Sequence, residues 1–323
     1  MLKINELDAE ILRNLLIDGR TSYDELAETC KVSKNKVWKR CRSMERNGII
    51  NGATTQIHFG QFGYDALVTL LIRVDSQQID QAMEALQRLT DLRTYRQYNS
   101  LYNVRAIASL KDLNELDYVK RIIREKLPTI SFKTYIWAGI RTIPENLNLL
   151  GVSSRKQHKF SAKTINDNHE VAVDEIDQKI ANVMYHEGRA SFSKIAKQVG
   201  LSTHTVIKRY ERLRKNGALK VSIQINPNKL GYFALLDLNV AFTTMRGLST
   251  NIVDLLSRIP DVIIITRTSG DFDLQVTALT RDLKQVFSVQ EEIARISGVT
   301  QIEASLRKAP DRWPTPQQYI TTI

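Results

Sequence analysis

Apolar positions in the first fifty residues recur with the spacing of amphipathic helices. Leu7, Ile11, Leu12 and Leu15 fall on one face of a first helix, and Gly19 stands where that helix is expected to end. This pattern predicts a short helix that covers a small core with one side.

Two further helices are predicted after short turns. Ser22 and Glu25 have the spacing of a capping box at the start of the second helix, and Ser33 caps the third after a turn at Lys31 and Val32. One side of the third helix is apolar and the other is polar and basic: Val37, Cys41 and Met44 against Lys34, Asn35, Lys36, Lys39, Arg40 and Arg42. Two helices joined by a short turn, the second of them basic, are typical of a helix-turn-helix.

The same segment occurs twice in the chain. The match continues without a gap from Asp8, which corresponds to Asp177, to Gly48, which corresponds to Gly217. A match of this length predicts a duplication. The second copy of the basic helix carries Ser202, Thr203, His204, Thr205, Lys208, Arg209 and Arg212.

Each third helix is followed by an Asn-Gly pair, Asn47-Gly48 or Asn216-Gly217, which favours a left-handed turn. Short strand candidates come next, at residues 54–58 and 220–225, and they predict a small wing.

The rest of each copy alternates strand and helix patterns in the order β-α-β-β-α-β, the ferredoxin-like arrangement. The expected strands are 66–74, 92–98, 104–110 and 131–138, with helices 79–89 and 113–125, and in the second copy strands 234–242, 262–268, 272–279 and 299–306, with helices 252–259 and 283–296.

The predicted fold class is therefore α+β, with two winged helix-turn-helix domains alternating with two ferredoxin-like domains. We expect the helix-turn-helix domains at 1–60 and 174–229 and the ferredoxin-like domains at 61–150 and 230–308. A polar linker is expected at 151–173. The tail, 309–323, contains three prolines and is expected to be irregular.

Charge points to a polyanionic partner. The chain of 323 residues has 46 Lys and Arg against 35 Asp and Glu, a formal net charge of +11. Such a balance favours nucleic acid first and an anionic membrane surface second. On the two basic helices the first residues are expected to reach base edges of double-stranded DNA, and the lysines and arginines to contact phosphates. Trp38 is expected in the core, with stacking on the DNA backbone as the alternative.

Several function classes are not expected. The most apolar runs, such as 65–74 and 261–266, are too short to cross a membrane, and the N-terminus is not that of a signal peptide. Cys30 and Cys41 have no zinc-site spacing, and two cysteines suit a reducing cytoplasm. Without a nucleophile triad, a P-loop or paired catalytic carboxylates, we expect no catalytic residue, metal or cofactor.

Together these motifs resemble the Lrp/AsnC family of feast/famine regulators. The resemblance rests on Asp18-Gly19-Arg20, Glu25-Leu26-Ala27, Arg46-Asn47-Gly48-Ile49-Ile50, Leu230-Gly231-Tyr232 and the segment 268–273. It covers nearly the whole chain twice, as a tandem form. It implies a DNA-binding transcriptional regulator whose ferredoxin-like domains pair, either in a homo-oligomer or as a pseudo-dimer within one chain.

The resemblance also implies an amino acid effector near the hairpin of Gly270, Asp271 and Asp273. A carboxylate there would pair with an ammonium group. The alternative is a plain hairpin turn. The first copy has Asn99 to Asn103 at this place and lacks the glycine and the carboxylates, so we expect any effector in the second copy.

Two other functions remain open. Siroheme decarboxylases are similar to this family in fold, and the stretch from Tyr95 to Asn103 weakly resembles theirs, although it contains no histidine. An architectural chromatin protein without an effector would also suit a basic tandem chain.

Overall fold

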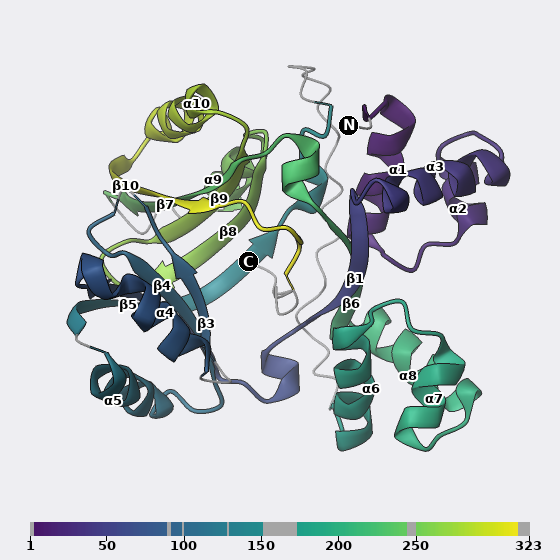
Figure 1. Ribbon diagram of the computed structural model, residues 1–323, viewed down its shortest axis with the longest axis horizontal. Coiled ribbons are helices and arrows are strands. Elements are labelled where there is room, and N and C mark those ends of the chain that lie inside the picture. The colour runs from purple at the N-terminus through teal and green to yellow at the C-terminus, as the bar shows by residue number, and fades with distance from the viewer. Residues whose placement is uncertain are drawn as a thin grey trace. The chain divides into compact units, whose positions relative to one another are not determined.

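The computed structural model describes residues 3–88, 92–98, 100–127, 129–150, 173–243 and 250–315. The chain forms two compact units (Figure 1). We call them the helical unit (Met1–Phe62, Thr142–Phe233 and Ala309–Thr322) and the sheet unit (Gly63–Arg141 and Ala234–Lys308). The linker expected at 151–173 lies, except for its last residue, outside the described residues.

The helical unit contains both helix-turn-helix copies. The first consists of α1 (Glu6–Ile17), α2 (Tyr23–Thr29), α3 (Lys34–Arg46) and β1 (Ile50–Ile57), and the second of α6 (Glu175–His186), α7 (Phe192–Val199), α8 (Thr203–Lys215) and β6 (Leu219–Ile225). The capping box of Ser22 and Glu25 is present, and Ser33 caps α3 as predicted. Gly48 and Gly217 have φ of 67° and 68°, the left-handed turns that Asn-Gly favours.

The strand after each third helix does not pair within its own copy. Instead, β1 and β6 pair with each other in an antiparallel two-stranded ribbon, from Ile50 opposite Ile225 to Ile57 opposite Leu219. The sequence predicted a small wing in each copy. The structure places both strands in one ribbon that belongs to the two copies jointly.

Each copy also packs on the strand of the other. The Gly19 amide donates to the Val221 carbonyl at 2.8 Å, and the Gly188 amide donates to the Ala53 carbonyl at 3.2 Å. A Cβ at Gly19 would lie 2.8 Å from the carbonyl carbon of Ser222, and one at Gly188 would lie 2.9 Å from the amide nitrogen of Thr54. The two glycines are therefore required by the close approach of backbone from the other copy.

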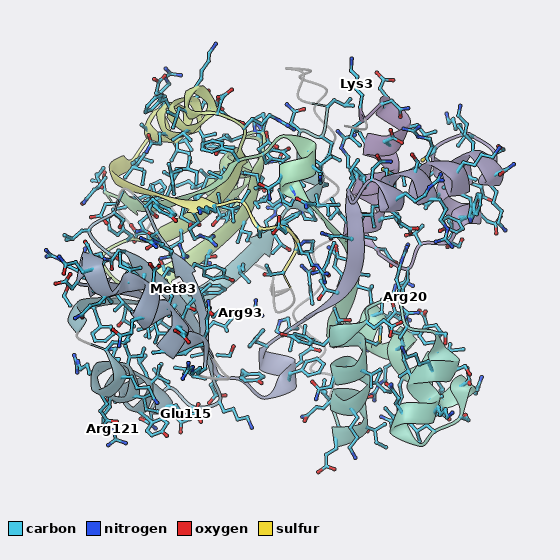
Figure 2. The ribbon with its side chains drawn as sticks, in the orientation of Figure 1. Lys3, Arg20, Met83, Arg93, Glu115 and Arg121 are labelled. Carbon is cyan, nitrogen blue, oxygen red and sulfur yellow. The ribbon has the colours of Figure 1, made fainter. Side chains whose placement is uncertain are left out.

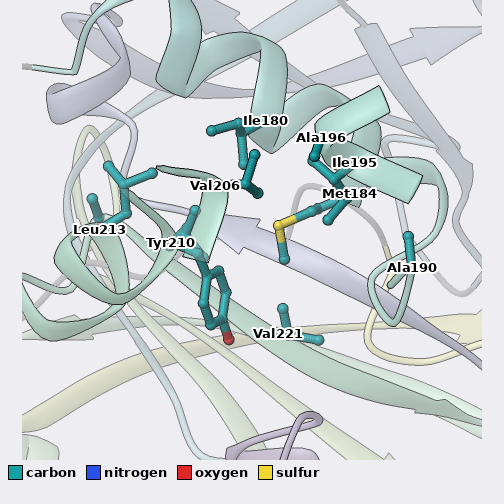
Figure 3. Packing of buried hydrophobic residues seen from close by; sticks show 11 residues of the cluster. Ile180, Met184, Ala190, Ile195, Ala196, Val206, Tyr210, Leu213 and Val221 are labelled. Carbon is teal, nitrogen blue, oxygen red and sulfur yellow. The ribbon is translucent and has the colours of Figure 1, made fainter. Parts of the chain in front are cut away.

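Figure 3 shows the core of the second copy, and side chains of the first copy pack against it. Ile180, Met184 and Val206 are fully buried there, and Ala53 and Ile57 of the ribbon pack against the same cluster. Burial of such aliphatic side chains contributes about 1.5–3 kcal/mol each. The two copies therefore stabilise one another and form one body.

In the sheet unit, the order β-α-β-β-α-β occurs twice, as predicted. The first half has β2 (Ala66–Val74), α4 (Ile79–Gln87), β3 (Leu92–Arg96), β4 (Val104–Leu110), α5 (Glu115–Lys126) and β5 (Thr129–Thr142). The second half has β7 (Ala234–Phe242), α9 (Thr250–Ser257), β8 (Val262–Ser269), β9 (Leu274–Thr280), α10 (Leu283–Ala294) and β10 (Val299–Lys308).

Both halves contribute to one eight-stranded sheet in the described chain, in the order β10-β7-β9-β8-β5-β2-β4-β3. The two ends of this sheet also meet, because Tyr98 and Leu306 form an antiparallel bridge. The sequence left open whether the ferredoxin-like domains pair within one chain. The structure pairs them within the chain.

One face of the sheet is apolar and is covered by helices. Leu70, Ile72 and Val104 are fully buried in a cluster with residues of α4 and α5. Successive strand residues point to opposite faces, so the residues between them lie on the other face. Several of those are polar and buried, among them Thr69, Arg105 and Asp237.

Asp237 is the centre of this polar face. Arg307 donates to both of its carboxylate oxygens, Thr277 donates to it at 2.7 Å, and Arg105 lies 3.6 Å from Oδ1. Burial raises the pKa of Asp237, but the two guanidinium groups outweigh burial, and the net pKa is below its ordinary value. Arg105 also donates to Gln275 at 2.8 Å, so the network crosses between the two halves.

No helix in the described part of the chain is long and apolar enough to span a bilayer. Among those same residues, no group of His, Cys, Asp or Glu side chains is placed to hold a metal ion. The tail, expected to be irregular, forms a backbone bridge in the described portion, between Trp313 and Ile225. Trp313 is buried.

Candidate nucleic-acid interface

The third helix of each copy is held at its N-terminus by a serine and along one side by the core. The Ser33 hydroxyl accepts from the Lys36 amide at 3.3 Å, and the Ser202 hydroxyl accepts from the Thr205 amide at 3.1 Å. The apolar side is buried, as predicted: Val37, Cys41 and Met44 in α3, and Val206, Tyr210 and Leu213 in α8.

The opposite side of each helix is exposed. The predicted DNA-binding residues exposed on α3 are Ser33, Lys34, Asn35, Lys36, Lys39 and Arg42, and those on α8 are Ser202, Thr203, His204, Lys208 and Arg212. Thr205 is half-buried. Each helix therefore presents the start of its polar face to solvent, as a helix that enters the major groove must.

Trp38 lies outside the core, contrary to our expectation. Its side chain is 44% exposed, and Ile207, at the matching position of α8, is 37% exposed. A helix turns by about 100° per residue, so the residue after buried Val37 points away from the core. The Arg42 guanidinium lies 6.0 Å from the Trp38 ring centroid. Both helices thus present one apolar side chain among polar ones.

Arg40 has an internal partner. It donates to both carboxylate oxygens of Asp8, whose side chain is completely buried, and the Arg40 side chain is 26% exposed. The hydrogen bond to Asp8 raises the pKa of Arg40. We predicted a phosphate contact for Arg40. In the structure this ion pair connects α3 to the start of α1, and the phosphate contact stays a prediction.

The second copy repeats this contact. Arg209 donates to Asp177 at 2.9 Å and to Asp174 at 2.7 Å, and Arg212 also donates to Asp177. Sequence reasoning missed these pairs. The signal was available, because the matched positions keep both the acid and the base.

Arg20 joins the two copies. It donates to the Ala190 carbonyl at 2.6 Å, and its guanidinium lies 4.4 Å from the Phe192 ring centroid. Figure 2 shows it where the first copy meets the second. Arg189 donates in return to the Gly19 carbonyl. The repeated Gly-Arg motif therefore forms the junction of the two helix-turn-helix copies, a role that the sequence analysis did not assign.

The predicted effector hairpin lies in the sheet unit. The Asp273 carboxylate accepts from the Phe242 amide at 2.8 Å, and Asp271 pairs with Lys133 of β5 at 3.1 Å. A Cβ at Gly270 would lie 2.8 Å from Cδ1 of Tyr135, also on β5. Asp273 is thus occupied by the backbone, whereas Asp271, which is 65% exposed, already holds an ammonium group from the first half.

Each copy matches a known family of DNA-binding domains. Residues 4–51 match the profile of a winged helix-turn-helix DNA-binding family, and residues 173–214 match the AsnC-type helix-turn-helix domain. The HTH-type transcriptional regulator FL11 of Pyrococcus horikoshii is 30% identical over 130 residues, which are 40% of this chain and 85% of that protein. FL11 of Pyrococcus furiosus is 28% identical over 131 residues, 39% of this chain and 83% of that protein.

A solved structure matches both units. The siroheme decarboxylase NirDL has a TM-score of 0.65 at 14% identity, over 98% of this chain and 95% of that one. At this identity the likeness concerns the fold alone. Each FL11 match uses less than half of this chain but covers most of the regulator. One copy of the internal repeat therefore corresponds to one whole regulator. The chain belongs to the Lrp/AsnC family of HTH-type transcriptional regulators, in a tandem-duplicated form.

Proposed function

We propose that one chain binds double-stranded DNA as a covalent pseudo-dimer, with α3 in one major groove and α8 in the next. One observation carries this proposal: β1 and β6 form one ribbon, and each copy packs on the strand of the other. In dimeric helix-turn-helix proteins, two recognition helices bind half-sites about one helical turn apart. Here a single helical unit holds both helices.

The exposed charges support binding to the DNA backbone. Lys36 and Lys39 on α3 and Lys208 on α8 are exposed at the helix faces that lie opposite the core. Lysines that neutralise phosphates release counterions, so binding weakens as salt concentration rises. Because Arg40 and Arg209 are bound to buried carboxylates, we assign the phosphate contacts to the lysines and to Arg42.

The test is the stoichiometry and salt dependence of binding. Light scattering after size exclusion gives the mass of the complex, and fluorescence anisotropy with an operator fragment gives the affinity. We expect one helical unit per pair of half-sites. Replacing Lys39 and Lys208 together by Ala should reduce the salt slope by about two. The matched control is Lys284→Ala on the exposed side of α10. An unchanged slope in the double variant would contradict the proposal.

We also propose that the second half of the sheet unit senses a small molecule with an ammonium group, an amino acid in the simplest case, through Asp271. In this proposal Lys133 occupies the carboxylate until the ligand displaces it. Titration calorimetry with the standard amino acids tests this. Asp271→Asn should abolish the heat of binding, and Asp273→Asn serves as the control for hairpin structure. Absence of binding to the unaltered chain would refute the effector proposal alone.

Higher assembly is a further part of the proposal. We expect chains to associate through the sheet unit into a homo-oligomer, and a monomeric mass at micromolar concentration would contradict that. The fold shared with NirDL makes siroheme the relevant enzymatic control. We expect no change in its spectrum or products on incubation with this chain. A regulator should also occupy discrete genomic sites, whereas an architectural protein would occupy DNA uniformly.

A further inference from the structure

We infer that the DNA site bound by one helical unit is not a palindrome: its two half-sites differ in sequence and stand in a fixed order. The inference rests on the proposed pseudo-dimer, because it concerns what the two helices of one helical unit read. It begins with the residues that the two helices present at matched positions.

We call the residues of α3 and α8 that face DNA in the proposed complex the reading residues. At matched positions of the two helices they differ almost throughout. Of the positions of α3 that are exposed at the N-cap and in the first two turns, only Ser33 and Lys39 are kept, as Ser202 and Lys208. The other pairs are Lys34 and Thr203, Asn35 and His204, Lys36 and Thr205, and Trp38 and Ile207. Further along the helix, Arg42 corresponds to Glu211, so even the charge is reversed.

These differences are of the kind that selects bases. On α3, Asn35 has the donor and acceptor pair that binds adenine, and Lys34 and Lys36 suit the acceptor edge of guanine. On α8, two threonines and Ile207 have methyl groups. In protein–DNA complexes such groups favour contact with the methyl group of thymine. His204 presents one ring donor or acceptor in place of the amide of Asn35. The α3 half-site should be richer in purines on the strand it reads, and the α8 half-site richer in thymine.

The fold makes each helical unit present two unlike helices to DNA. A homodimer would present the same helix twice and would prefer a palindrome. In this chain α3 and α8 are held in one body by the ribbon, by the two glycine contacts and by the Arg20 and Arg189 hydrogen bonds. If two chains associate, each helical unit still contains one copy of each helix.

The experiment is selection of bound sequences from random duplex DNA by the full-length chain, followed by affinity measurements. Three fragments are compared: the selected site and the two palindromes made by doubling either half-site. We expect a selected site with unlike halves, and each palindrome bound at least tenfold more weakly, which equals about 1.4 kcal/mol.

A transplant variant gives the positive test. Lys34→Thr, Asn35→His, Lys36→Thr and Trp38→Ile together place the α8 reading residues on α3, at positions that are exposed and outside the core. This variant should prefer the palindrome of the α8 half-site over the natural site. Lys284→Ala should leave the preference unchanged.

The outcomes separate the two proposals. If no sequence is enriched and no fragment is bound, the proposed function itself is wrong. If a palindrome is enriched, or both palindromes bind as tightly as the selected site, DNA binding stands and the inference of unlike half-sites is wrong. A transplant variant that keeps the thermal stability and the preference of the unaltered chain would also overturn the inference.

Discussion

Arg40 provides the sharpest test of how the structure divides the basic residues of α3. Sequence alone groups it with Lys39 as a phosphate contact. In the structure its guanidinium pairs with a carboxylate, Asp8, that has no exposed surface. Arg40→Ala should therefore reduce stability first, whereas Lys39→Ala should reduce DNA binding and leave stability unchanged.

The magnitude follows from the buried carboxylate. Removing one partner of a buried ion pair costs about 3–5 kcal/mol. Asp8 keeps one donor, the Asn5 amide at 3.0 Å, and Arg40 is partly exposed, so we expect about 2–4 kcal/mol. In a unit of this size each kcal/mol lowers Tm by roughly 2–4 °C, which gives roughly 4–16 °C for Arg40→Ala.

The assay compares the two variants in parallel. Circular dichroism gives thermal unfolding, and anisotropy at several salt concentrations gives binding. Lys39→Ala should keep the Tm of the unaltered chain. The slope of its log affinity against log salt concentration should fall by about one. The reasoning is refuted if Arg40→Ala has the same Tm as the unaltered chain and its affinity depends less on salt concentration, as expected of Lys39→Ala. The Asp8 carboxylate would then not need its partner.

Three further results are expected. Gly19→Ala should destabilise the helical unit by about 1–3 kcal/mol in urea unfolding, because its Cβ meets backbone of the other copy, whereas Gly60→Ala, whose Cβ would be 3.6 Å from His58, should have little effect. The ion pairs of Asp237 lower its pKa, so they stabilise the fold above the unfolded value of about 3.9 and are lost as pH falls through the lower folded value. The Tm difference between the unaltered chain and Asp237→Asn should therefore shrink below about pH 4, and a constant difference would contradict this. Burial raises the pKa of Cys41 to about 11, so its thiol should resist alkylation at pH 8 until the chain unfolds, and labelling of the folded chain at Cys41 as fast as a free thiol would disprove that.

Much of the fold was predictable because its signals are local. Strands 66–74 and 234–242 were predicted with the bounds that the structure has, since a mostly apolar run limited by polar turns depends only on near neighbours. The caps at Ser22 and Ser33 and the left-handed Gly48 followed from the same short range. The repeat itself was visible because duplicated residues stayed in register.

The partners of those elements were not predictable in the same way. Nothing in residues 50–57 says whether β1 pairs in its own copy or with β6, since either pairing satisfies its backbone hydrogen bonds. A basic residue on a polar helix face has the same local pattern whether it meets phosphate, as expected of Lys39, or a buried acid, as Arg40 does. Sequence alone determined the two copies, their helices and strands and their basic faces. Only the tertiary structure decided that the copies share one ribbon and that each packs on the strand of the other, because those contacts join residues far apart in the chain.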